Sequence, residues 1–316
     1  MAYRGRQQNG APMPSTAEPA ARARRGHLRG ARIQGLALLA VTACSWGLNW
    51  PVMKFILSEL PPFTARALGA GLGLAFALLL AWARGERLRP PRDQLWPLAV
   101  FASLNYGGFS VFTTIALVWL RASEAVVITY TLPIWAALLA WPMLGERPTL
   151  GRGAGMVLAF AGVALLVGAD QTRTGLSDWP GIGSALLAAV LFGLGTVIAK
   201  RRPLRMAPIA GVAWQIALGS IPVLALALFE RPEWGRATPL AWWGLVYVGI
   251  MPMTVAYLTW FRALLLLPAS IAATSVLLSP LVGVLASAAL LGDPLGPRQL
   301  LALAVALTGV GLAARS

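Results

Sequence analysis

The chain has 316 residues, of which 58% are hydrophobic and 12% are charged. An ordinary soluble domain carries about 25% charged residues, so this composition excludes such a domain and favours a lipid environment. The net charge of +15 does not indicate nucleic-acid binding, because the basic residues form short clusters between apolar segments. A single cysteine, Cys44, and a single histidine, His27, exclude a disulfide framework and a zinc site with several such ligands. We expect no metal and no cofactor.

The amino-terminal segment, residues 1–32, is polar and rich in arginine. It has too few apolar residues to build a core, which predicts a disordered tail. Its arginines favour the cytoplasmic side of a membrane.

From Ile33 onward, apolar stretches follow one another almost without interruption, each of about the 20 residues that cross a bilayer as a helix. They predict an all-α membrane protein with ten transmembrane helices. The predicted spans are Ile33–Leu57, Phe63–Ala83, Trp96–Val118, Ser123–Leu144, Gly151–Gly168, Trp179–Lys200, Pro208–Phe229, Trp242–Leu264, Ser270–Leu291 and Gln299–Ala314.

The distribution of lysine and arginine predicts the orientation. With the amino terminus inside, nineteen basic residues fall on the cytoplasmic side and seven on the outer side. Cytoplasmic loops of membrane proteins carry this excess. We therefore expect a multi-pass protein of a bacterial inner membrane with both termini in the cytoplasm.

The sequence also matches itself at a shift of 147 residues. This shift pairs Pro133 with Pro280 and Gly162 with Gly309, and a shift of 146 residues pairs Lys54 with Lys200. Such spacing predicts two repeats, residues 33–168 and 179–314, with five helices each. An odd number of helices makes consecutive copies enter the membrane in opposite directions, and inverted repeats are typical of secondary transporters.

These features resemble the drug/metabolite transporter superfamily, specifically its EamA-type branch with ten helices. The resemblance rests on Ser45 to Trp50, Ala116-Leu117, Ala122-Ser123, Pro133 and Leu144-Gly145-Glu146, and on their counterparts Phe192-Gly193, Ala263-Leu264, Ala269-Ser270, Pro280 and Leu291-Gly292-Asp293. It covers roughly residues 33–314. It implies a central cavity lined mainly by helices 1, 3, 4, 6, 8 and 9, and an exporter of amino acids, related metabolites or drugs. Bacterial aromatic and neutral amino-acid exporters are similar.

Three prolines inside predicted spans mark candidate hinges or kinks: Pro133, Pro280 and Pro252. A proline inside a helix removes a backbone hydrogen bond and frees a carbonyl group that can face a cavity. The alternative is that the kinked helices only pack into a curved bundle.

The candidate substrate-binding residues are polar and aromatic side chains within predicted spans. Asn105 and Phe109 share one stripe of the third helix, and Tyr106 lies on the next stripe. The full set is Trp46, Asn49, Asn105, Tyr106, Phe109, Tyr130, Trp214, Tyr257 and Thr274. The alternative for each is hydrogen bonding between helices or aromatic packing in the core.

The charges within the spans bear on the mechanism. No Asp or Glu falls in the central part of a predicted span, and intramembrane carboxylates are the usual carriers of coupled protons or sodium ions. We therefore expect facilitated diffusion or exchange. Lys54 and Lys200 lie at helix ends, where they can reach the interface, whereas Arg66 lies further inside and can contact an anionic group.

The favoured function is export of neutral amphipathic metabolites, most of all apolar or aromatic amino acids, by alternating access. The first alternative is efflux of drugs or other metabolites by the same fold. A carrier of phosphorylated sugars or nucleotides would need several basic residues at mid-membrane. A membrane-embedded enzyme would need a carboxylate pair, a histidine dyad or a metal cluster, so we expect no enzyme. We expect a monomer, because one chain holds both halves of the pathway.

Overall fold

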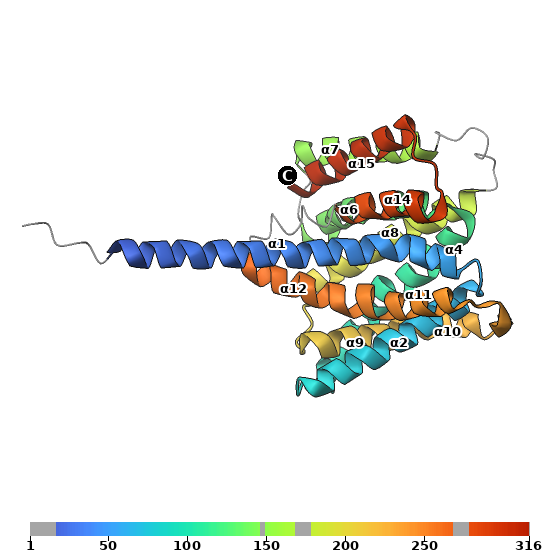
Figure 1. The fold of residues 1–316 in the computed structure, drawn as a ribbon, viewed down its shortest axis with the longest axis horizontal. Helices are drawn as coiled ribbons and strands as arrows, with labels where there is room; N and C mark the ends of the chain where they lie inside the picture. Colours follow the sequence, from blue (N-terminus) through green and yellow to red (C-terminus); the bar gives the residue numbers. More distant parts are fainter. Residues whose placement is uncertain (1–16, 146–148, 168–177, 268–277, 316) are drawn as a thin grey trace, which may run out of the picture.

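The computed structural model describes residues 17–145, 149–167, 178–267 and 278–315, and within these ranges the regular structure is helical. The first half contains α1 (Ala17–Ile56), α2 (Pro62–Ala83), η1 (Arg92–Gln94), α3 (Leu95–Phe101), η2 (Ala102–Gly108), α4 (Phe109–Trp119), α5 (Ala122–Thr129), α6 (Leu132–Leu144) and α7 (Leu150–Val167). The second contains α8 (Trp179–Arg201), α9 (Pro208–Gly219), α10 (Ile221–Ala227), η4 (Trp234–Arg236), α11 (Pro239–Ile250), η5 (Met251–Val255), α12 (Ala256–Leu266), α14 (Leu278–Leu291) and α15 (Pro297–Arg315). The long helices run roughly side by side along one direction (Figure 1).

Seven helical segments in the described part of the chain are long and apolar enough to cross a membrane. They are Gly30–Ile56, Pro62–Ala83, Arg92–Trp119, Ala122–Leu144, Trp179–Arg201, Pro208–Ala227 and Pro239–Trp260. Three shorter apolar helices cover Gly153–Leu165, Leu278–Leu291 and Pro297–Leu312. The predicted all-α membrane fold is confirmed, and helices cover the described residues of nearly every predicted span.

Several spans are interrupted where the sequence analysis expected a single helix. The third contains the π-helix η2 and the eighth contains the π-helix η5, which includes Pro252. The fourth breaks at Tyr130 and Thr131, and Pro133 lies in the first turn of the following helix α6. Proline tolerates a first helical turn because its missing N–H has no partner there. Pro280 lies in the first turn of α14, and the residues before Leu278 lie outside the described ranges.

The amino-terminal segment differs from the expected disordered tail. Residues 17–32 are helical and continue into the first span, so that α1 extends well beyond the bundle (Figure 1). Alanine and arginine are abundant here, and both are strong helix formers. A segment joined to a helix already formed in the membrane avoids the unfavourable nucleation step.

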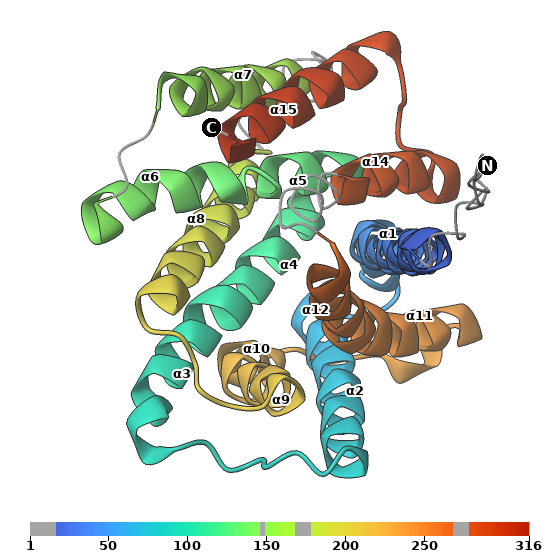
Figure 2. The ribbon, with the colours of Figure 1, turned by 90° about the vertical axis from the view of Figure 1, so that its left-hand side faces the viewer.

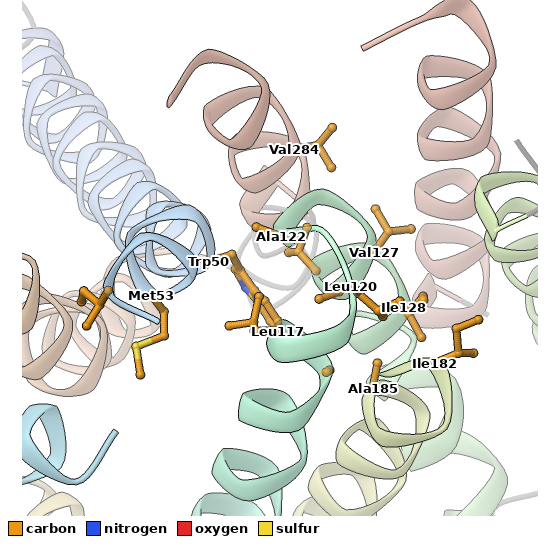
Figure 3. Packing of buried hydrophobic residues seen from close by; sticks show 14 of the residues in the cluster. Trp50, Met53, Leu117, Leu120, Ala122, Val127, Ile128, Ile182, Ala185 and Val284 are labelled. Carbon is orange, nitrogen blue, oxygen red and sulfur yellow. The ribbon is translucent and has the colours of Figure 1, made fainter. Parts of the chain in front are cut away.

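The main apolar core joins the two halves of the chain. Trp50 and Met53 from α1, Leu120 from the end of α4 and Val284 from α14 belong to one cluster, and Figure 3 shows them with their neighbours on α5 and α8. Met53 is completely buried. The outer surface is apolar as well, with Trp82 76% exposed, which suits contact with lipid.

Helices α7 and α15 cross at two glycines. A Cβ atom at Gly162 would lie 2.4 Å from the backbone nitrogen of Ala306, and one at Gly309 would lie 2.2 Å from that of Ala159. Only residues without a side chain allow this approach, which is common between membrane helices. A shift of 147 residues converts one contact into the other. Figure 2 shows the two helices side by side at the edge of the bundle.

A second pair of contacts surrounds the two π-helical spans. A Cβ atom at Gly73 would lie 2.7 Å from the carbonyl oxygen of Gly249, and one at Gly219 would lie 2.7 Å from that of Ala102. The first contact joins α2 to α11, and the second joins α9 to η2. Shifts of 146 and 147 residues again relate the partners.

Carboxylates at helix ends also connect the two halves. Glu230, which follows α10, accepts hydrogen bonds from the backbone nitrogens of Phe63 and Thr64 at the start of α2, at 3.0 and 2.6 Å. Glu86, which follows α2, accepts one from the backbone nitrogen of Ala210 in the first turn of α9, at 2.9 Å. Each carboxylate satisfies N–H groups that a helix leaves unpaired at its amino-terminal end.

Two further acidic residues act in the same way. Asp293 accepts from the backbone nitrogen and the hydroxyl of Ser123 at 3.0 and 2.6 Å, at the start of α5. Glu59 accepts from the backbone nitrogen and the hydroxyl of Thr238 at 2.7 and 3.0 Å, beside α11. These carboxylates therefore bind helix ends.

Candidate functional site

A cavity of about 110 Å³ lies among the helices that carry most of the predicted binding residues. Its walls come from α1, α2, η2, α4, α8, α9, η5 and α12. The lining residues are Trp46, Asn49, Arg66, Asn105, Tyr106, Phe109, Ser110, Phe192, Val212, Gln215, Ile216, Pro252, Met253 and Tyr257.

Six of the predicted binding residues meet at this cavity: Trp46, Asn49, Asn105, Tyr106, Phe109 and Tyr257. They come from three separate spans, so their positions in the sequence did not predict that they lie together. Pro252, predicted only as a kink, also lines the cavity.

The remaining predicted residues lie elsewhere or are not described. Tyr130 ends α5 and packs against Trp50, with ring centroids 6.5 Å apart, beside the main core. Trp214 points its indole nitrogen at the carbonyl oxygen of Leu88, in the loop after α2, at 2.6 Å. Thr274 lies outside the described residues.

The two π-helices bring their residues together across the cavity. The Tyr106 hydroxyl of η2 donates to the Met253 sulfur of η5 at 3.3 Å. Asn105 donates from its side-chain amide to the carbonyl oxygen of Phe192 on α8, at 3.4 Å. In many membrane and soluble proteins, a single π-helical turn marks a functional site.

The Trp46 indole of α1 also lines the cavity, next to η5. Its nitrogen donates to the carbonyl oxygen of Pro252 at 3.0 Å. Its ring meets Tyr257 edge to face, with centroids 5.6 Å apart, and a second aromatic pair joins Phe109 and Phe192 at 5.2 Å. These rings offer an apolar surface with a preference for aromatic partners.

One side chain in the wall carries a permanent charge. Arg66 on α2 is 6% exposed, and its Nε donates to the Thr114 hydroxyl at 2.9 Å. Thr114 in turn donates to the carbonyl oxygen of Ser110 at 2.7 Å. No carboxylate among the described residues forms an ion pair with Arg66.

Lys54, the other basic residue of the first spans, lies at the end of α4 and not at the cavity. Its ammonium group donates to the carbonyl oxygens of Leu117 and Leu120 at the end of α4, at 2.5 and 2.9 Å. It therefore holds the end of α1 to the end of α4 and is not among the residues that line the cavity.

Four lining residues outside the predicted substrate-binding set, one of them Pro252 that was predicted only as a kink, lie at the repeat spacing from a candidate residue. A shift of 146 residues leads from Trp46 to Phe192 and from Arg66 to Val212, and a shift of 147 leads from Asn105 to Pro252 and from Tyr106 to Met253. Applying the shift to each candidate residue would have found them. The repeat spacing does not lead to Gln215 or Ile216 from any candidate residue.

The fold and the cavity define a class of protein: a multi-pass α-helical membrane protein with an internal cavity formed by broken helices. The EamA-like transporter family matches residues 33–168 and 179–315, and the chain belongs to this family. It is therefore a membrane transporter with a small-molecule substrate, and it is not an enzyme.

Curated relatives agree with this assignment. An uncharacterized transporter of Bacillus subtilis (strain 168), YvbV, is 29% identical over 280 residues, covering 87% of this chain and 90% of the relative. The aromatic amino acid exporter YddG of Ancylobacter novellus is 29% identical over 218 residues, covering 67% and 75%. The protein PecM of Dickeya dadantii (strain 3937) is 28% identical, covering 81% and 84%.

A solved crystal structure is similar over nearly the whole chain. It has a TM-score of 0.64 and 26% sequence identity, and the match covers 90% of this chain and 96% of that one.

Proposed function

We propose that this transporter exports small neutral amphipathic metabolites, most of all apolar or aromatic amino acids, across a bacterial inner membrane. The observation that carries the proposal is the cavity itself, where Trp46, Tyr257, Phe109 and Phe192 offer aromatic surface beside the amides of Asn49, Asn105 and Gln215. Aromatic rings favour apolar side chains, and amides can bind polar ends. A relative named for aromatic amino-acid export supports this choice.

The size of the cavity favours small cargo. Its volume of about 110 Å³ is well below the roughly 300–1,000 Å³ of pockets for drug-sized ligands. We therefore place efflux of drugs second, as a function to be detected by the same experiment.

The proposed mechanism is alternating access by two inverted repeats of five helices each, residues 33–168 and 179–314. The family matches these two segments separately. The paired contacts Gly162–Ala306 and Ala159–Gly309 also support it. Two similar units in opposite orientations can close the cavity first toward one side and then toward the other.

Among the described residues that line the cavity, none is Asp or Glu. Since intramembrane carboxylates usually carry the coupled ion, we propose facilitated diffusion or exchange. We also propose that one chain suffices, and that both termini face the cytoplasm.

Flux through the purified protein in sealed liposomes tests the function. Radiolabelled leucine, phenylalanine and methionine are measured first without an ion gradient and then with an imposed proton gradient. Saturable flux without a gradient is expected, with protein-free liposomes as the control. Absence of flux for every amino acid in both conditions would reject amino-acid cargo and favour drugs or other metabolites.

A further inference from the structure

The Arg66 guanidinium is the one feature of the cavity that a purely neutral cargo does not explain. It is more than nine-tenths buried and lines the cavity wall. A guanidinium has five N–H donors, of which the structure pairs the Nε–H with Thr114.

Such a charge is costly unless something compensates for it. Arginine cannot lose its proton in a protein, so it cannot become neutral on burial as lysine can. A buried charge without an opposite charge is strongly unfavourable, and within a membrane it is usually functional. The Thr114 hydroxyl supplies a hydrogen bond but no negative charge.

Arg66 is the one charged side chain among the described residues that line the cavity. The residue at the repeat spacing from Arg66 is Val212, which also lines the cavity. Arg66 lies in the second turn of α2, near the end that starts at Pro62. The cavity thus has one cationic end, whereas Trp46, Tyr257, Phe109 and Phe192 supply its aromatic surface.

We propose that Arg66 binds the carboxylate of the cargo, so that the ligands of this site are amphipathic monocarboxylates and a carboxylate is required. This inference rests on the proposed function: it names the group of the cargo that the site binds, and it adds anionic monocarboxylates to the neutral amino acids. A guanidinium binds a carboxylate with two parallel hydrogen bonds, which fixes the orientation of the ligand. Its apolar body then lies against the aromatic rings.

The ammonium group of an amino acid is not required by this scheme. The lining residues that the structure describes include no Asp or Glu to pair with an ammonium group, and neutral oxygens such as those of Asn49 and Asn105 are left to receive it. Aromatic carboxylates without an ammonium group should therefore bind as well as the amino acid. Aromatic amines without a carboxylate should be repelled by Arg66.

Binding to the purified full-length protein in detergent tests the ligand class directly. Calorimetry compares L-phenylalanine, 3-phenylpropionate and 2-phenylethylamine, which share a phenyl group and differ in their charged groups. We expect 3-phenylpropionate to bind at least as tightly as L-phenylalanine, and 2-phenylethylamine at least tenfold more weakly. Equal binding of the amine and the two carboxylates would overturn the proposal.

Variants of Arg66 test the residue. Arg66→Gln should weaken binding of 3-phenylpropionate by tenfold or more, while Arg66→Lys should retain part of it because the charge remains. Arg87→Gln removes an exposed arginine outside the cavity and serves as the matched control, with unchanged affinity expected. Affinity within twofold of the parent protein for Arg66→Gln would overturn the assignment.

The carboxylate site and amino-acid export can fail independently, and the combined results tell them apart. If Arg66→Gln does not fold, the ligand series on the parent protein and on Arg66→Lys still decides. If phenylalanine shows no flux but 3-phenylpropionate binds in an Arg66-dependent way, amino-acid export is rejected and the carboxylate site stands. If phenylalanine shows flux that Arg66→Gln does not alter, export stands and the carboxylate site is rejected.

Discussion

At the scale of single residues, the cavity depends on a few hydrogen bonds that hold aromatic rings in place. Trp46 is fixed at its nitrogen by the carbonyl oxygen of Pro252, and at its ring by Tyr257. Trp214 is fixed in the same chemical way, by the carbonyl oxygen of Leu88, but away from the cavity lining. Trp46 therefore lines the cavity, whereas Trp214 connects α9 to the loop after α2.

We expect Trp46→Phe to raise the KM for phenylalanine flux about two- to tenfold, because a lost hydrogen bond costs about 0.5–1.5 kcal/mol. The variant should still fold, with a lower thermal midpoint, because the hydrogen bond that it loses lies within the protein. Trp214→Phe is the matched control and should lower the thermal midpoint while leaving KM unchanged. Flux kinetics in liposomes and thermal unfolding in detergent measure both effects. An unchanged KM for Trp46→Phe would remove Trp46 from the binding site.

Trp46 and Trp214 also show which site residues could be predicted from the sequence and which could not. Residue type and depth along the span selected nine candidate binding residues, and six of them line one cavity: Trp46, Asn49, Asn105, Tyr106, Phe109 and Tyr257. Trp214 has the same type and a similar depth. In a helix that is apolar on all sides, periodicity does not tell which face meets the cavity, so the direction of the indole depends on packing.

At the scale of helices, the spans could be predicted because lipid requires long apolar helices with satisfied backbone groups. Their interruptions could be predicted only in part. Pro133 lies directly after a break in the fourth span, whereas the π-helix at Ala102–Gly108 contains no proline. Its neighbour is Gly219, which contacts the carbonyl oxygen of Ala102, so this break depends on a partner far away in the sequence.

The hydrogen bonds between Glu230 and the start of α2 should contribute to thermal stability. Glu230 accepts two backbone hydrogen bonds and one hydroxyl hydrogen bond at the start of α2. Loss of a residue that caps a helix costs about 0.5–2 kcal/mol, so Glu230→Ala should lower the thermal midpoint clearly. Glu233→Ala is the control, because Glu233 is exposed and pairs only with Arg236 three residues away, an interaction of little net value.

Thermal unfolding of both variants in the same detergent gives the comparison. Glu230 is not among the cavity residues, so the KM for flux should stay at the parent value. Equal midpoints for the two variants would show that the Glu230 contacts add nothing to stability.

At the scale of the whole molecule, the repeat spacing connects features that appear separately along the chain. It relates the glycine contacts of α7 with α15 to each other, and it relates the π-helical span of the third helix to that of the eighth. It also relates Arg66 of the first repeat to Val212 of the second, so that a charged residue corresponds to an apolar one. If the two repeats are related by symmetry, as we propose, the cavity can open to one side of the membrane and then to the other. Because only one repeat supplies the Arg66 charge, the ligand can keep one orientation throughout.

The excess of basic residues predicts how the protein is oriented in the membrane, and two single-cysteine variants test this orientation. Cys44 is first replaced by alanine, which leaves no cysteine in the chain. Ser58→Cys then places a thiol in the exposed turn between α1 and α2, and Arg87→Cys places one in the exposed loop after α2. Because α2 crosses the membrane between them, the two thiols must face opposite sides.

The excess of basic residues predicts which side is which. A maleimide that does not cross membranes should label Ser58→Cys in intact cells, and Arg87→Cys only after the cells are opened. The reverse pattern would place the amino terminus outside and the cationic end of the cavity, near Pro62, toward the cytoplasm. Arg66 would then meet the carboxylate of a substrate first on the cytoplasmic side, so the labelling result also decides from which side the charged end of the site is approached.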